Sequence, residues 1–246
     1  MWLTALLNST FAGPANSVMQ AVGYKNVDPA HPWSNWLATE ILVVAILVVL
    51  VAILRRGFSV DKPGGLQHTA ELIFSFVKGE TNDAIEHDGS RYVAFFGTLF
   101  VFILFMNLIG IIPGMEAPTM NPSVPAGLAL AAFAYYNWAG IREQGLLKYL
   151  AHFMGPVWWL APIMIPIEII SHLARLLSLT IRLYANMFAG EQVTNTFLAL
   201  TYFVIPSVFM GLHVFVSFLQ AFIFMLLTII YVSQAVAHDH SHEPEV

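Results

Sequence analysis

The chain has 246 residues, of which 58% are hydrophobic and only 10% are charged, and its formal net charge is −5. A soluble domain carries about 25% charged residues, so this composition excludes a protein that exposes its whole surface to water. The sequence has no cysteine, which excludes disulfide frameworks, thiolate metal sites and cysteine nucleophiles.

The N-terminal segment, residues 1–35, mixes apolar and polar residues with glycine and proline, and we predict an extracytoplasmic head without a core of its own. Trp33 and Trp36 then mark a membrane interface. An apolar run that ends at Leu54 predicts a first membrane-crossing helix over residues 36–56. Residues 66–86 repeat apolar side chains at helical spacing but are too polar to span, which predicts an amphipathic helix on the membrane surface.

Four further apolar segments predict crossing helices over residues 92–112, 124–142, 157–191 and 206–237. The last two would each be about 50 Å long if straight, against a hydrocarbon layer of about 30 Å. Segment 157–191 is therefore either broken near Pro162 and Pro166 or strongly tilted. We predict an all-α integral membrane fold with five crossing helices, one amphipathic surface helix, and the last two helices tilted as a hairpin.

The basic residues indicate how the membrane domain, residues 36–237, is oriented. Of ten Lys and Arg residues, five lie in residues 55–91, and two more are Arg142 and Lys148. Because cytoplasmic loops are enriched in positive charge, we place these two loops in the cytoplasm, the N-terminus outside, and the tail 238–246 inside. Arg175 and Arg182 are left within the apolar segment 157–191, where topology does not account for them.

Ionisable and polar residues form a stripe along segment 157–191. On a helical wheel, five of them fall within about 80°: Glu168, His172, Arg175, Arg182 and Asn186. Two serines lie to one side: Ser171 and Ser178. A weaker polar stripe follows segment 206–237: His213, Ser217, Gln220, Tyr231 and Gln234. Two matching stripes on otherwise apolar helices predict a hydrated path between these helices or towards a partner.

Arg182 is the residue in this pattern that is hardest to explain by structure alone. A charge at the bilayer centre costs at least about 2.5–3.5 kcal/mol. Glu168 is about 21 Å away along the helix, and Glu191 points to another side. We therefore predict that the counter-ion of Arg182 comes from another chain. Since arginine keeps its proton, Arg182 suits a fixed charge, whereas nearby Glu and His side chains can exchange protons.

Structural interpretations stay open for several of these residues. Arg175 could extend to the interface or pair with Glu168 or with another helix, and His213 could be a hydrogen-bonded packing residue. Asn107, near the end of segment 92–112, could cap a helix or bond between helices. The tail sequence HDHSHE could bind a divalent metal or simply be solvated. We predict no metal site and no cofactor.

Three motifs resemble subunit a of F-type ATP synthases: SLTIRLYANMFAGE at residues 178–191, LQAFIFM at 219–225 and FMNLIGIIP at 105–113. The resemblance covers about residues 35–237. It implies that Arg182 faces the ring of c subunits, with Asn186 and Gln220 around it. It further implies that Glu191 and His213 belong to a periplasmic half-channel, and Glu168 and Ser171 to a cytoplasmic one. Peripheral-stalk b subunits, membrane lipid and a bacterial inner membrane are the implied surroundings.

We therefore expect a non-catalytic, proton-translocating subunit with two offset half-channels that are separated by Arg182. The sequence lacks a phosphate-binding Gly-Lys-Ser/Thr loop, and no nucleic-acid partner is expected. A stand-alone ion-coupled transporter or channel is the alternative, although no internal repeat is visible. An intramembrane protease lacks its motifs. His213 and Glu191 suit protons, and sodium remains the other candidate ion.

Overall fold

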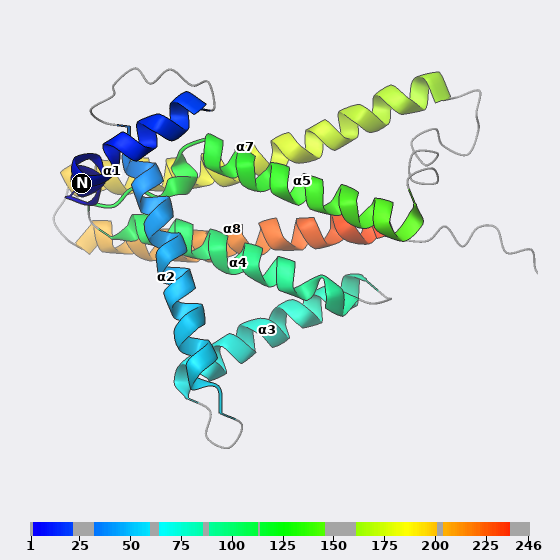
Figure 1. The fold of residues 1–246 in the computed structure, drawn as a ribbon, viewed down its shortest axis with the longest axis horizontal. Coiled ribbons are helices and arrows are strands. Elements are labelled where there is room, and N and C mark those ends of the chain that lie inside the picture. Colours follow the sequence, from blue (N-terminus) through cyan, green and yellow to red (C-terminus); the bar gives the residue numbers. More distant parts are fainter. Residues whose placement is uncertain are drawn as a thin grey trace, which may run out of the picture. The chain divides into compact units, whose positions relative to one another are not determined.

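The computed structural model describes residues 2–21, 32–59, 64–85, 89–112, 114–145, 161–200 and 204–236. Within these ranges every regular element is helical (Figure 1). The elements are α1 (Trp2–Ala21), α2 (Asn35–Gly57), α3 (Gly65–Ala84), η1 (Gly89–Arg91), α4 (Val93–Leu108), η2 (Ile109–Ile111), η3 (Pro118–Met120), α5 (Ser123–Gln144), α7 (Ala161–Leu200) and α8 (Val204–Val236). The predicted all-α fold is confirmed. The predicted tail, 238–246, and residues 157–160 lie outside the described residues.

Four helical segments of the described chain are long and apolar enough to cross a membrane: Asn35–Gly57, Val93–Ile111, Pro162–Leu200 and Pro206–Val236. They coincide with four of the five predicted crossing helices. The fifth, α5, has 22 residues and is about 33 Å long, enough to span. Its alanines, glycines and tyrosines make it less apolar than the other four, because small and hydroxylated side chains add little hydrophobicity. The crossing by α5 stays a prediction.

Helix α3 forms almost where the amphipathic surface helix is predicted. Val77 and Thr81 are fully buried, whereas Leu72 and Phe74 are 69% and 56% exposed. The helix is therefore confirmed, and it presents large apolar side chains outwards. Its location on a membrane surface stays a prediction.

Helix α7 is continuous over 40 residues, which makes it about 60 Å long. Pro162 lies in its first turn, where a missing N–H is harmless, and Pro166 lies inside it without ending it. Of the two alternatives for this segment, the break near these prolines is therefore excluded, and a strong tilt stays a prediction. The predicted end at residue 191 is wrong, because α7 runs on to Leu200 through a segment that lacks glycine and proline. Helix α8 has 33 residues, about 50 Å, and is likewise longer than an upright crossing helix needs.

The N-terminal segment contains a helix that the sequence analysis did not predict. Helix α1 includes Pro14, and its backbone leaves helical geometry at Phe11 (φ −121°, ψ 17°). Asn8 holds Trp33 through two hydrogen bonds: its Nδ2 donates to the Trp33 carbonyl at 3.3 Å, and its Oδ1 accepts from the Trp33 N–H at 3.0 Å. The Thr4 hydroxyl donates to Asn35 Oδ1 at 2.7 Å. These contacts tie α1 to the start of α2.

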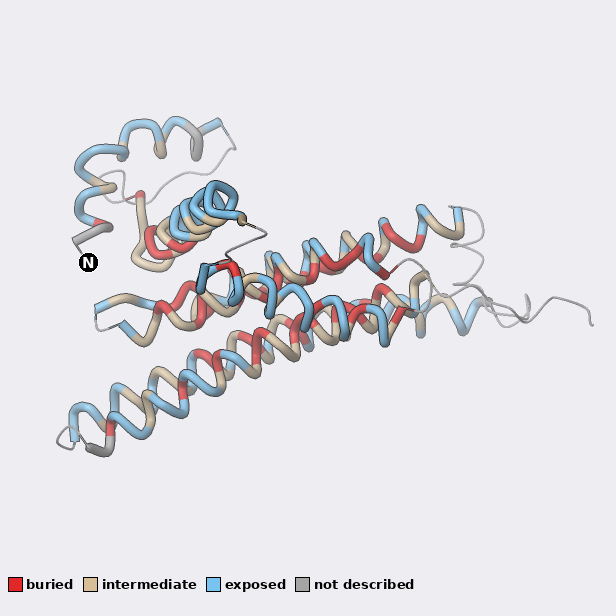
Figure 2. The backbone as a smooth tube through the Cα atoms, turned by 90° about the horizontal axis from the view of Figure 1, so that it is seen from below, coloured by how far each residue is buried: buried red, intermediate tan, exposed pale blue. Residues whose placement is uncertain are grey.

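The chain divides into two compact units. Unit 1 comprises residues 1–68, 101–121 and 184–220, and unit 2 comprises 69–100, 122–183 and 221–246, each as far as described. The core of unit 1 includes Ala38, Val43, Ile103, Met106 and Met187. The core of unit 2 includes Phe96, Phe100, Leu183, Met225 and Ile229. Figure 2 shows buried and exposed residues alternating along the long helices, as expected for helices that bury one face.

Candidate functional site

Arg182 lies at the border between the buried and exposed faces of α7. Leu179 and Leu183 beside it are buried, whereas Ile181 is 58% exposed. Its Nη2 atom donates a hydrogen bond to the Ser178 hydroxyl at 3.2 Å, one turn earlier. No carboxylate of the described residues forms an ion pair with the guanidinium. The half-buried charge of Arg182 is therefore neutralised by nothing in the described part of this chain.

A polar cluster in unit 2 contains several of the predicted site residues. His172 Nε2 lies 3.4 Å from Glu168 Oε1, one turn away on α7. The other ring nitrogen, Nδ1, is hydrogen-bonded to the hydroxyl of Tyr136 on α5. The guanidinium of Arg175 lies over the ring of Tyr231 on α8, 5.0 Å from its centroid. Arg175, which belongs to the predicted polar stripe of α7, therefore makes a cation–π contact with a neighbouring helix.

The candidate site residues of unit 1, called the unit 1 cluster below, are Glu191 on α7 and His213 and Ser217 on α8. Three buried atoms there have no hydrogen-bond partner among the described residues: Glu191 Oε2, His213 Nε2 and Ser217 Oγ. His213 is only 7% exposed, and its ring lies against Gly190. A Cβ atom at position 190 would come within 3.0 Å of His213 Nδ1, so the ring can lie here because residue 190 is glycine.

Asn107 links three elements of unit 1. Its Nδ2 donates to the Ser217 carbonyl of α8 at 3.3 Å, and its Oδ1 accepts from the Thr119 hydroxyl of η3 at 2.8 Å. All three residues are completely buried. Of the two structural interpretations of Asn107, the structure supports the bond between helices. Asn107 thereby fixes the part of α8 that carries His213.

The remaining predicted residues lie along the same two helices. Asn186 is half-buried on α7, one turn after Arg182, and Ser171 is half-buried near the other end of the stripe. Gln220 is buried on α8 at 7% exposure. Tyr184 stacks on Phe188 with ring centroids 5.7 Å apart. Among the described residues no group of His, Asp and Glu could hold a metal ion, and the HDHSHE tail lies outside them.

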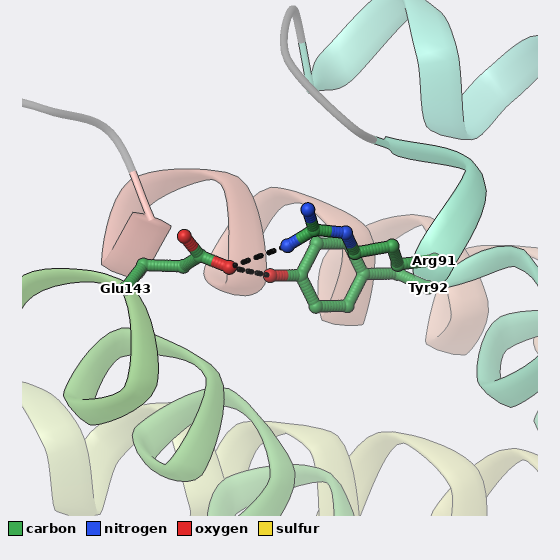
Figure 3. Close-up of polar contacts among 3 residues, drawn as sticks. All are labelled: Arg91, Tyr92 and Glu143. Atoms are coloured by element: carbon green, nitrogen blue, oxygen red, sulfur yellow. Dashed lines mark hydrogen bonds and ion pairs between the residues drawn. The ribbon is translucent and has the colours of Figure 1, made fainter.

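Sequence reasoning missed Tyr136, which completes the unit 2 cluster. Helix α5 gives no clear periodic signal, because its alanines occur on all of its sides and its aromatic residues are few. Sequence reasoning also missed a cluster between η1 and the end of α5, which Figure 3 shows in close-up. Arg91 Nη1 donates to Glu143 Oε1 at 3.2 Å, and the Tyr92 hydroxyl bonds to the same oxygen at 3.5 Å. Burial raises the pKa of Tyr92, and the charge of Glu143 raises it further, so the phenol keeps its proton.

Comparison with known proteins places this geometry in a family. A family model described as "ATP synthase A chain" matches residues 37–233. "ATP synthase subunit a" of Solibacter usitatus is 60% identical over 235 residues, which cover 96% of this chain and 100% of the relative. The protein of the same name from Koribacter versatilis is 50% identical, with 98% of each chain covered. "ATP synthase subunit a 1" of Syntrophotalea carbinolica is 43% identical, with 87% of each chain covered. The chain belongs to the ATP synthase A chain family.

Proposed function

We propose that this chain is the proton-translocating subunit of the membrane sector of a rotary ATP synthase. It provides two offset half-channels to a ring of c subunits, and Arg182 is the fixed charge that separates them. The observation that carries the proposal is a half-buried arginine without a carboxylate partner in the described chain. Relatives that are 60% and 50% identical are named as ATP synthase subunit a, which agrees with this function.

The cluster in unit 1 has the chemistry of an aqueous half-channel. Buried polar atoms are almost always hydrogen-bonded to protein or to ordered water. The unpaired atoms of Glu191, His213 and Ser217 therefore call for water molecules among them. Such water, together with a carboxylate and an imidazole that can both exchange protons, forms a conducting path. We assign this cluster to the periplasmic half-channel, with Asn186 and Gln220 towards its inner end.

The cluster in unit 2 suits the cytoplasmic half-channel. Glu168 and His172 are in contact, and the Glu168 side chain is 37% exposed at the surface of the chain, where the proposed half-channel brings water to it. Ser171, Arg175 and Ser178 follow on α7 towards Arg182. The side assignment agrees with the positive charge of residues 55–91 and 142–148, which places the start of α7 at the cytoplasm. The N-terminus then lies outside the bacterial inner membrane and the C-terminus inside.

Arg182 divides the two paths electrostatically. A carboxylic acid of the ring that arrives beside a permanent positive charge is driven to ionise, because an opposite charge lowers its pKa by about 1–3 units. The acid releases its proton to one half-channel, passes Arg182 as an anion, and takes a new proton from the other. The chain itself makes and breaks no bond in ATP. Peripheral-stalk b subunits and lipid are the remaining neighbours that we propose.

Replacement of Arg182 tests this function. We expect Arg182→Ala to abolish ATP synthesis driven by a proton gradient, while the complex still assembles. Arg182→Lys should also fail, because a desolvated lysine can lose its proton. The measurement is ATP synthesis in inverted membrane vesicles, with subunit content checked by native electrophoresis.

The matched control is Arg142→Ala. It removes an exposed arginine whose guanidinium carbon lies 5.2 Å from the centroid of the Trp138 ring. This variant should keep near-normal synthesis. Near-normal coupling in Arg182→Ala would contradict the role assigned to Arg182.

A further inference from the structure

Tyr136 on α5 encloses the imidazole of His172 within unit 2. Its hydroxyl is hydrogen-bonded to His172 Nδ1, and the two rings are nearly parallel, with centroids 5.6 Å apart and planes 10° apart. Phe133, one turn earlier, meets the imidazole edge-on at 6.1 Å. Because two aromatic residues of α5 pack against the imidazole and one of them is hydrogen-bonded to it, His172 has little freedom to rotate.

The opposite nitrogen of the same ring faces the surface of the chain. His172 Nε2 lies 3.4 Å from Glu168 Oε1, and the two side chains are 11% and 37% exposed. Tyr136 is only 2% exposed. Exposure therefore falls in the order Glu168, His172, Tyr136, and the imidazole is held between a carboxylate at the surface of the chain and a buried phenol.

The phenol can keep its bond to the ring in both protonation states of His172. A tyrosine hydroxyl both donates and accepts, so it can donate to a neutral Nδ1 and accept from a protonated one. With Nδ1 occupied in this way, Nε2 carries the hydrogen that points at Glu168. A phenylalanine at position 136 would fill nearly the same space but could not form a hydrogen bond with His172 Nδ1.

We propose that Tyr136 is a positioning residue of the cytoplasmic half-channel, which holds His172 in line with Glu168 throughout proton exchange. This inference rests on the proposed function. The charged and titratable groups around the ring, among the residues described, are Glu168 and Arg175 on α7, Tyr136 on α5 and Tyr231 on α8. Arg175 is itself held over Tyr231.

The test is passive proton conduction through the membrane sector in vesicles, after removal of the soluble sector, as a function of pH on the cytoplasmic side. We expect Tyr136→Phe to slow conduction by about fivefold, the effect of losing one hydrogen bond. The pH profile should move towards lower pH, because the bond to the charged ring is the stronger one. His172→Gln should remove the part of the pH dependence that comes from titration of His172. In the His172→Gln background, Tyr136→Phe should cause no further loss of proton conduction.

Tyr135→Phe is the matched control, since Tyr135 stacks on Phe95 at 3.6 Å and lies outside the cluster. It should leave both the rate and the profile unchanged. The inference would be overturned if Tyr136→Phe kept the wild-type pH profile of proton conduction. It would also be overturned if Tyr136→Phe reduced conduction in the His172→Gln background as much as it does alone. If Arg182→Ala still abolishes coupling in that case, the proposed function stands and only the role of Tyr136 falls.

Discussion

The imidazole of His213 occupies space that a single methyl group at residue 190 would take. A Cβ atom there would meet His213 Nδ1 at 3.0 Å and Cε1 at 3.3 Å. We expect Gly190→Ala to displace the ring at a cost of about 1–3 kcal/mol and to lower proton conduction at least several-fold. Gly211→Ala, on α8 with open space around its position, is the control. Equal conduction in the two variants would show that the contact between Gly190 and His213 has no functional role.

At the residue scale, the spacing of polar residues predicted contacts of the candidate site along α7 but gave no such prediction for α5. Glu168 and His172 lie one turn apart on a helix, so counting residues predicts that they meet, and they do. The partner of His172 on the other side comes from a helix without a polar stripe, and only packing brings Tyr136 there. The stripe on α8 includes Tyr231, but its contact with Arg175 depends on how two helices pack, which no wheel describes.

Helix α7 ends at Leu200, which is nine residues beyond Glu191, the end predicted from the sequence. We predict that spin labels on single cysteines at positions 192–200 show mobility with a period of about 3.6 residues. The chain has no cysteine of its own, so each label reports one site. Uniformly high mobility would indicate a loop and contradict the length of α7.

At the element scale, apolar length predicted the helices well, and their ends less well. Segments that must satisfy all backbone hydrogen bonds in lipid form helices, so α2, α4 and α8 follow from composition. The end of α7 was misplaced, because a polar residue such as Glu191 within an apolar segment neither ends nor extends a helix by itself. Helix α1 was missed because Gly13 and Pro14 interrupt its pattern.

At the scale of the whole molecule, the proton-exchanging residues of the candidate site divide between the two compact units. Unit 1 carries Glu191, His213 and Ser217, and unit 2 carries Glu168, His172 and Tyr136. Arg182 belongs to the last residues of unit 2 on α7, and unit 1 resumes at Tyr184. The fixed charge thus stands, in chain order, between the two sets of proton-exchanging groups. The sequence predicted this order, whereas the unpaired atoms of unit 1 became apparent only from the fold.

The most direct test of the fixed-charge role is proton flux through the membrane sector with the ring locked by a disulfide to a cysteine introduced into this chain. If Arg182 separates two half-channels, the locked wild-type complex passes no protons, because each must travel on the ring. The locked Arg182→Ala complex should leak, because the electrostatic barrier between the paths is gone. Equal flux through the two locked complexes would contradict the account.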